Sequence, residues 1–206
     1  MIRAALFDFG GVISTSPFEA FTRYEVENGL PGDFLRGLNS TNPDTNAWAR
    51  HERNELTFDE FCDAYEAEAQ SAGHRIDARE VIGCLSGDIR PEMVEAIQRC
   101  HERLRTGLIT NNMSPMGQGD ESAASFIHEL FDVIIESSIV GVRKPDQRIY
   151  EITCEQLGVR ADEIVFLDDL GVNLKPAAQM GMTTIKVVDA DKAIAELAAV
   201  VGFPLA

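Results

Sequence analysis

Short runs of apolar residues recur along the chain, with polar or charged residues between them. The first run leads from Ile2 to Phe7, and four more follow in the second half of the chain. A strand buried on both faces of a parallel sheet is a near-continuous apolar segment rather than an alternating one. The pattern therefore predicts five buried strands, over residues 2–7, 106–109, 133–135, 164–167 and 183–188.

Amphipathic helices are predicted between the later strands. Pro91 and Pro145 mark the start of two of them, because proline is tolerated in a first helical turn, and Asp189 is a suitable cap for the last. Their apolar faces consist of Met93, Ile97 and Leu104, of Ile149, Ile152 and Leu157, and of Ile194, Leu197 and Val201. Strands that alternate with helices in this way indicate an α/β fold with a doubly wound parallel sheet.

Between the first strand and Pro91 the strand pattern disappears, and the periodicity is helical. This stretch predicts a helical insert, residues 16–88, within a core formed by residues 1–15 and 89–206. Thr57 and Glu60 have the spacing of a capping box at the start of one helix.

Aromatic residues in the insert are expected to form its own apolar core. They are Phe18, Phe21, Tyr24 and Trp48. We expect Arg50, His51 and Arg53 to lie on a solvated helix face instead. Polar and charged residues more often cover a helix than fill its packed side.

Charge and composition limit the classes of partner that the chain is expected to bind. The 206 residues carry a formal net charge of −16 and a sequence pI near 4.5, which disfavours nucleic acid because phosphate backbones attract lysine and arginine. The four cysteines are widely spaced, as is typical of reduced thiols in a cytoplasmic protein. No apolar run approaches the length of a membrane span, so no membrane partner is expected. The sequence leaves the oligomeric state open.

Polar residues follow the ends of the predicted strands. They are Asp8, then Thr110, Asn111 and Asn112, then Lys144, and finally Asp168 and Asp169. Because the carboxyl ends of parallel strands share one edge of a sheet, these side chains are expected to line a single crevice. Gly10 and Gly11, directly after Asp8, let the backbone approach a bound group closely, and we expect Gly11 to contact the substrate.

Carboxylates gathered in this way repel one another, by up to about 4 kcal/mol per pair at about 4 Å in a medium of effective dielectric near 20. Lys144 and a bound Mg²⁺ would offset the repulsion, since Mg²⁺ prefers hard oxygen ligands and often a substrate phosphate. Thr110 and Asn111 add a hydroxyl and an amide donor for an anionic oxygen. This combination of nucleophile, metal and donors is typical of phosphoryl transfer to and from a small phosphorylated metabolite.

The order of these motifs resembles the haloacid dehalogenase-like hydrolases, and the resemblance extends over the whole chain. Within that family the chain looks closest to the phosphatase domain of bifunctional soluble epoxide hydrolases. The stretches that carry this likeness are Phe131–Ile135, Gly141–Pro145, Phe166–Asp169 and Asn173–Pro176. The resemblance implies a Rossmann-like core with a helical cap.

The resemblance also implies a role for each motif. Asp8 would attack phosphorus and form an aspartyl-phosphate. Thr110 and the backbone after it, including Asn111, would hold the phosphate, and Lys144 would bridge the nucleophile and the phosphate charge.

The remaining motif residues are implied to form the metal site. Asp169 would bind Mg²⁺ together with Asp8 and the backbone carbonyl of Gly10. Asp168 would orient Lys144 or a metal-bound water, and Asn173 would support the site from behind.

Gly10 departs from the family pattern, because phosphatases of this kind usually carry a general acid and base aspartate there. General acid–base catalysis typically contributes about 10² to 10⁴-fold. Three interpretations follow: a phosphatase whose leaving group departs without strong proton donation, a dehalogenase that needs no such proton and no metal, and a binding or regulatory module without turnover. The sequence favours the first, a Mg²⁺-dependent hydrolase of a small phosphomonoester.

Overall fold

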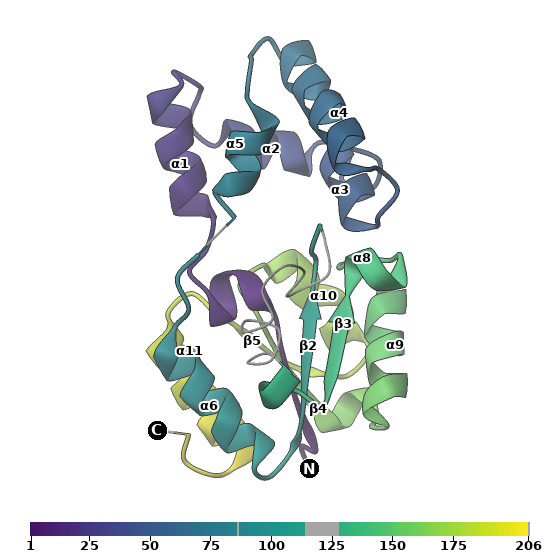
Figure 1. Ribbon diagram of the computed structural model, residues 1–206. Helices are drawn as coiled ribbons and strands as arrows, with labels where there is room; N and C mark the ends of the chain where they lie inside the picture. The colour runs from purple at the N-terminus through teal and green to yellow at the C-terminus, as the bar shows by residue number, and fades with distance from the viewer. Residues whose placement is uncertain (86, 114–127, 206) are drawn as a thin grey trace.

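The computed structural model describes residues 1–85, 87–113 and 128–205. Its centre is a five-stranded parallel sheet with strand order β3-β2-β1-β4-β5. The strands are β1 (Ala4–Phe7), β2 (Arg105–Thr110), β3 (Val133–Glu136), β4 (Ile164–Asp168) and β5 (Thr183–Lys186). The α/β class with a doubly wound parallel sheet is thereby confirmed (Figure 1).

Helices cover both faces of the sheet. Alternate residues of β1 divide between the two faces, with Ala5 and Phe7 in one apolar cluster and Ala4 and Leu6 in the other. Helices α6 (Pro91–His101) and α11 (Ala190–Val201) supply the first cluster, and α9 (Gln147–Leu157) and α10 (Gly171–Gln179) supply the second. The core also contains η1 (Phe9–Ile13), α8 (Ser137–Val140) and η2 (Ala161–Glu163).

Three predicted elements are shorter than the apolar pattern suggested. Strand β1 begins at Ala4 instead of residue 2. Helix α6 ends at His101, and Leu104 lies beyond it in a turn where its amide donates to the Cys100 carbonyl. Strand β5 ends at Lys186, and Val188 is 80% exposed. Beyond α6 and β5, apolar residues continue along the chain after the regular helix or strand has ended.

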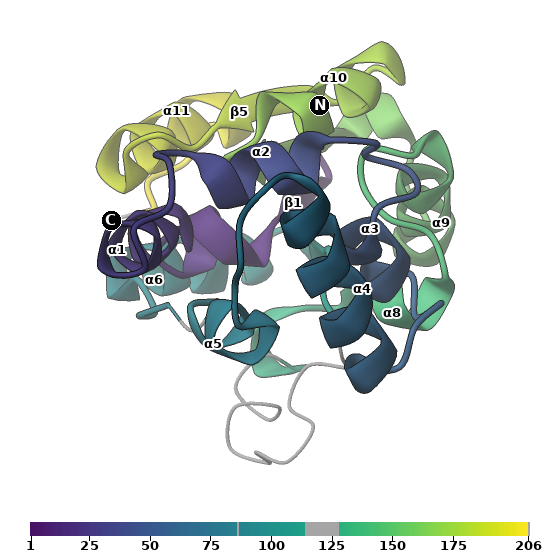
Figure 2. The same cartoon turned by 90° about the horizontal axis from the view of Figure 1, so that it is seen from above.

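The helical insert consists of α1 (Phe18–Glu27), α2 (Phe34–Ser40), α3 (Ala47–Glu52), α4 (Phe58–Ser71) and α5 (Ala78–Gly83). It lies beyond the carboxyl ends of the strands (Figure 1), and Figure 2 shows it from above. Its apolar cluster contains Phe21, Tyr24 and Trp48, with Phe18 packed against it, as predicted. The capping box of Thr57 and Glu60 at the start of α4 is also present.

One expectation for the insert is wrong. His51 is 5% exposed and its ring stacks on Phe61 at a centroid distance of 4.6 Å, so it belongs to the apolar interior. Its Nδ1 contacts the Leu56 carbonyl at 3.0 Å, and burial lowers the pKa of the imidazole. A neutral imidazole with one hydrogen-bonded nitrogen packs like an aromatic ring. The sequence pattern did not indicate this, because histidine is counted there as a polar residue.

The insert joins the core through two linkers that run side by side. Ser14 and Ile89 form an isolated antiparallel bridge, and the Thr15 amide donates to the Asp88 carbonyl at 2.9 Å. The Asp88 amide donates in turn to the Thr15 hydroxyl at 3.1 Å. A Cβ on Gly87 would lie 2.7 Å from the Thr15 carbonyl oxygen, so the two linkers approach closely here. The exact division at residues 16 and 88 stays a prediction.

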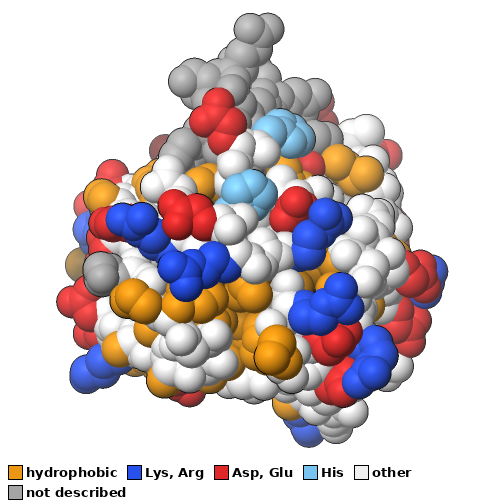
Figure 3. All heavy atoms as spheres, turned by 90° about the horizontal axis from the view of Figure 1, so that it is seen from below, with side chains coloured by type: hydrophobic (Ala, Val, Ile, Leu, Met, Phe, Trp, Pro, Cys, Tyr) orange, Lys and Arg blue, Asp and Glu red, His pale blue; other side chains and the backbone are white. Residues whose placement is uncertain are grey.

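The outer surface carries charges of both signs. On the face of the core away from the insert, acidic and basic side chains are interspersed with apolar ones (Figure 3). Within the described ranges, none of the helices has the length and apolar character needed to cross a lipid bilayer.

Candidate active site

Asp8 and Asp168 lie side by side because β1 and β4 are paired neighbours. Asp8 follows β1 and caps η1, where its Oδ1 accepts the Phe9 amide at 2.7 Å. Asp168 is the last residue of β4 and is fully buried. The prediction that strand ends bring these carboxyl groups together is thus realised in the structure.

Lys144 lies between the two carboxylates. Its Nζ is 2.8 Å from Asp8 Oδ1 and 2.8 Å from Asp168 Oδ2, and it donates to the Ile109 carbonyl at 2.9 Å. These three contacts match the three hydrogens of an ammonium group. The side chain is 1% exposed, so the charge is held away from water by its partners.

Asp168 is fixed by further donors. Its Oδ1 accepts the Leu170 amide at 2.8 Å, and the Asn173 amide group donates to Oδ1 and Oδ2 at 3.0 and 3.1 Å. Asn173 is itself buried, at 4% exposure. The structure therefore places Asn173 behind Asp168, where it orients the carboxylate that contacts Lys144.

Asp169 completes a cluster of three carboxyl groups. One oxygen from each of Asp8, Asp168 and Asp169 lies within 4.8 Å of the other two. Hard oxygens at this separation suit a divalent cation. Because Asp168 already accepts from Lys144, Leu170 and Asn173, the two remaining carboxylates are the better metal ligands, and the donor set fits the predicted ion.

Gly11 lies directly against this cluster. Its φ is +75°, and a Cβ added there would clash with the Asp169 carboxylate. The Arg90 guanidinium donates to the Gly11 carbonyl at 3.1 Å. In the structure Gly11 thus lets Asp169 approach the backbone, whereas its predicted contact with substrate stays a prediction.

Crowding perturbs the titration of the cluster. Burial, with a smaller contribution from Asp168, raises the pKa of Asp8 to about 8 although Lys144 opposes the shift. Burial and the charge of Asp168 raise the pKa of Asp169 to about 6. For Lys144 burial acts to lower the pKa, but Asp168 and Asp8 outweigh it and the pKa is raised. The site therefore favours a bound positive charge beyond the lysine.

Thr110 and Asn111 lie at the end of β2. Thr110 is 5% exposed and is the last residue of β2, where it pairs with Glu136 of β3. Asn111 uses its side chain on the protein itself: its amide donates to the Lys144 carbonyl at 3.0 Å, and its carbonyl oxygen accepts the Lys144 amide at 2.8 Å. The structure therefore gives the Asn111 side chain a place beside the lysine loop, which leaves its main chain for the predicted phosphate contact.

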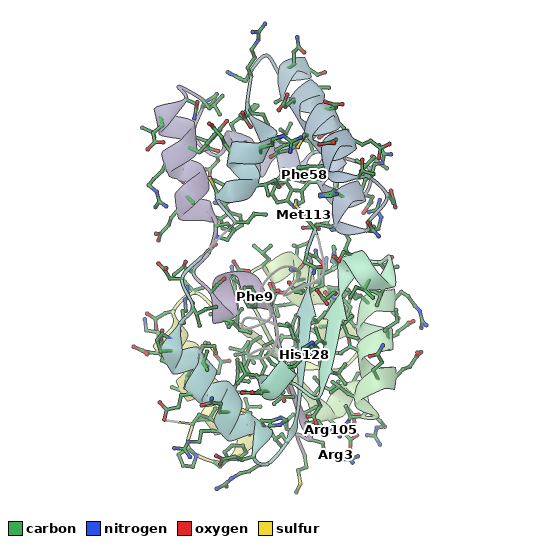
Figure 4. The ribbon with its side chains drawn as sticks, in the orientation of Figure 1. Arg3, Phe9, Phe58, Arg105, Met113 and His128 are labelled. Carbon is green, nitrogen blue, oxygen red and sulfur yellow. The ribbon has the colours of Figure 1, made fainter. Side chains whose placement is uncertain are left out.

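Sequence reasoning missed several groups near the site. Arg90, whose contact with Gly11 is described above, directly precedes the helix-starting Pro91 and could have been noticed there. Asn112 was predicted to line the crevice, but its contacts were not: they are with the Glu136 carboxylate, the Ser137 hydroxyl and the backbone and hydroxyl of Ser138. Met113, just beyond β2, packs against the apolar cluster of the insert (Figure 4).

These features define an α/β protein with an acidic site at the strand ends and a helical insert beyond it. Residues 2–181 match the sequence model of the haloacid dehalogenase-like hydrolases. The chain belongs to this family, as its motifs predicted.

Characterised relatives support the same family. The chain is 34% identical to acyl-CoA dehydrogenase family member 10 of Mus musculus and 33% identical to bifunctional epoxide hydrolase 2 of the same species, over 98% of this chain in each case. It spans only 19% and 39% of those two proteins. A sesquiterpene phosphatase of Aspergillus oryzae is 28% identical over 97% of both chains. The match to an epoxide hydrolase confirms the branch that the motifs suggested.

Solved structures share the fold. A haloacid dehalogenase-like family hydrolase from Porphyromonas gingivalis superimposes with a TM-score of 0.72 over 98% of both chains at 20% identity. A family enzyme from Bacteroides thetaiotaomicron in complex with magnesium and inorganic phosphate gives 0.62 at 18% identity, over 90% of this chain and 94% of its own. The L-2-haloacid dehalogenase of Xanthobacter autotrophicus gives 0.63 at 18% identity, over 97% and 83%.

Proposed function

We propose that the protein is a Mg²⁺-dependent phosphatase that hydrolyses a small phosphomonoester through an aspartyl-phosphate on Asp8. The observation that carries the proposal is the contact of one buried lysine, Lys144, with both Asp8 and Asp168, beside a third carboxylate at Asp169. Related proteins named as phosphatases, and a fold relative in complex with magnesium and inorganic phosphate, support it.

In the proposed reaction an oxygen of Asp8 forms a bond to phosphorus as the bond from phosphorus to the leaving-group oxygen breaks. Lys144 holds the Asp8 carboxylate through Oδ1, so that Oδ2 is the oxygen outside these contacts. Thr110 and the backbone of Asn111 hold the phosphate oxygens. A water molecule then attacks phosphorus, releases inorganic phosphate and restores the carboxylate.

Asp8, Asp169 and the Gly10 carbonyl would hold Mg²⁺, whose charge stabilises negative charge on the phosphate oxygens. Asp168 keeps Lys144 in place, and Asn173 keeps Asp168 in place. The leaving group takes its proton from water or from the insert, because Gly10 provides none. We therefore expect turnover to favour acidic leaving groups.

The helical insert serves as a cap in this proposal. It lies beyond the carboxyl ends of the strands, where it would exclude bulk water and select the substrate (Figure 1). The paired linkers at Ser14 and Ile89 connect it to the core beside the site.

A dehalogenase is the second candidate, favoured by Gly10, since a departing halide needs no proton. The cluster around Asp169 argues against it, because a metal-independent reaction would bring a carboxylate substrate beside Asp168 and Asp169 with only Lys144 to offset their charge. A non-catalytic binding module is the third.

Phosphate release from a panel of phosphorylated metabolites and aryl phosphates, with and without Mg²⁺, tests the proposal. We expect Mg²⁺-dependent release that rises as the leaving group becomes more acidic. The Asp8→Asn variant should lose about 10⁴-fold or more of this activity, whereas Asp191→Asn, at an exposed position of α11, should retain it. Halide release without metal would select the dehalogenase, and release unaffected by Asp8→Asn would refute the mechanism.

A further inference from the structure

Arg143, the residue before Lys144, reaches from the core to the helical insert. Its Nε lies 2.6 Å from Glu52 Oε2 at the end of α3, and its Nη1 donates to the Pro43 carbonyl at 2.9 Å. One core side chain is therefore held by two separate segments of the insert.

The partner of Arg143 is buried. The Glu52 side chain is 8% exposed, and its other oxygen, Oε1, accepts the Trp48 indole N–H at 2.9 Å. The Arg143 side chain is 19% exposed. Arg148 and Glu155, by contrast, form an exposed ion pair, with side chains that are 50% and 64% exposed. Exposed pairs contribute little to stability. The pair of Arg143 and Glu52 differs from them in its burial and in its further hydrogen bonds to Pro43 and Trp48.

The loop that carries Arg143 is also tied to β2. The side chain of Asn111 bonds to both the amide and the carbonyl of Lys144, as described for the site. Lys144 is thus fixed on one side by the core, through Asn111, and its neighbour is fixed on the other side by the insert, through Glu52. A shift of either contact would move the backbone that directs the Lys144 ammonium toward Asp8.

We propose that Arg143 is a positioning residue whose ion pair with Glu52 couples the seating of the insert to the position of Lys144. When the insert is seated, the pair holds the loop in the geometry in which Lys144 contacts Asp8 and Asp168. When the pair is broken, the loop loses its second anchor. The catalytic consequence rests on the proposed phosphatase function, whereas the coupling itself does not.

The Lys144 backbone amide reports the coupling without any need for turnover, because it donates to Asn111. We would measure its hydrogen exchange by NMR in the wild type, in Glu52→Gln, in Arg143→Gln and in the double variant. Glu55→Gln is the matched control, since Glu55 also pairs with an arginine at 2.6 Å, but within the insert and at 45% exposure.

We expect exchange at Lys144 to be about tenfold faster in each single variant, without a further increase in the double variant, and unchanged in the control. Amides of β4 and α9 should keep their wild-type rates. Faster exchange confined to the insert, or an equal increase throughout the chain, would overturn the proposal, because either result would mean that the pair stabilises the protein without fixing the loop.

Kinetics provide the second measurement. If the wild type releases phosphate, Glu52→Gln should lower kcat about tenfold and leave KM within about twofold, because the lysine acts on the reacting groups more than on binding. An unchanged kcat would contradict the catalytic part of the inference. If the wild type is inactive on every substrate, the proposed function fails, and the exchange measurement still decides whether the pair holds the loop.

Discussion

At the scale of single residues, the two adjacent glycines after Asp8 have different roles that the sequence could not separate. Gly11 has φ of +75° and lies against the Asp169 carboxylate, whereas nothing lies within 4 Å of a Cβ placed on Gly10, whose φ is −68°. The difference arises from the approach of a loop more than 150 positions away in the chain. The residues around Gly10 and Gly11 give no indication of that approach.

Alanine substitutions should separate the two glycines. We expect Gly11→Ala to lower the free energy of unfolding by about 1–3 kcal/mol, through the left-handed conformation and the clash with Asp169. Gly10→Ala should stay within about 0.5 kcal/mol of the wild type. Urea unfolding of both variants checks this. Equal effects would show that neither close approach nor backbone conformation distinguishes the two positions.

The same limit explains which site residues the sequence revealed. Asp8, Lys144 and Asp168 could be predicted to meet because parallel strand ends share an edge. The bonds of Asn111 to the Lys144 backbone could not, since they depend on the path of a loop. The position of Arg90 before Pro91 could have been noticed, but its contact with the Gly11 carbonyl could not.

At the scale of elements, the sheet was the most predictable part. Buried parallel strands have a simple apolar signature, and all five were found, with β1 and β5 each predicted two residues too long. The insert was recognised as helical, but its internal contacts were not. Glu25 illustrates why: its buried carboxylate accepts the amides of Asp33 and Leu35 at 2.9 Å and so caps α2 from another helix. Periodicity shows which face of a helix is apolar, but not what packs on it.

At the scale of the whole molecule, the acidic cluster links stability and pH to the proposed metal binding. The folded-state pKa values of about 8 for Asp8 and about 6 for Asp169 both exceed the ordinary value of 3.8. The folded protein thus retains protons that the unfolded chain has released above about pH 4. The contribution of these two groups to stability is present at low pH and is lost as pH rises toward about 8.

At the proposed metal site Mg²⁺ should reverse this loss, because it would bind the ionised carboxylates and release their protons. We expect Mg²⁺ affinity to rise about tenfold per pH unit between pH 6 and pH 8, where one proton leaves for each ion bound. Calorimetric titrations in buffers of different ionisation enthalpy measure both the affinity and the released protons. Asp169→Asn should bind weakly at every pH. An affinity independent of pH would mean that these carboxylates do not hold the ion.

The phosphorylation of Asp8 is the central claim, and the most direct measurement is to trap it. The protein would be mixed with Mg²⁺ and a substrate that it hydrolyses, and the reaction would be quenched in acid within milliseconds. The protein would then be digested and analysed by mass spectrometry. The account predicts a phosphoryl group on the peptide that contains Asp8, absent without substrate. A phosphoryl group on another residue, or an unmodified Asp8 throughout demonstrated turnover, would contradict it.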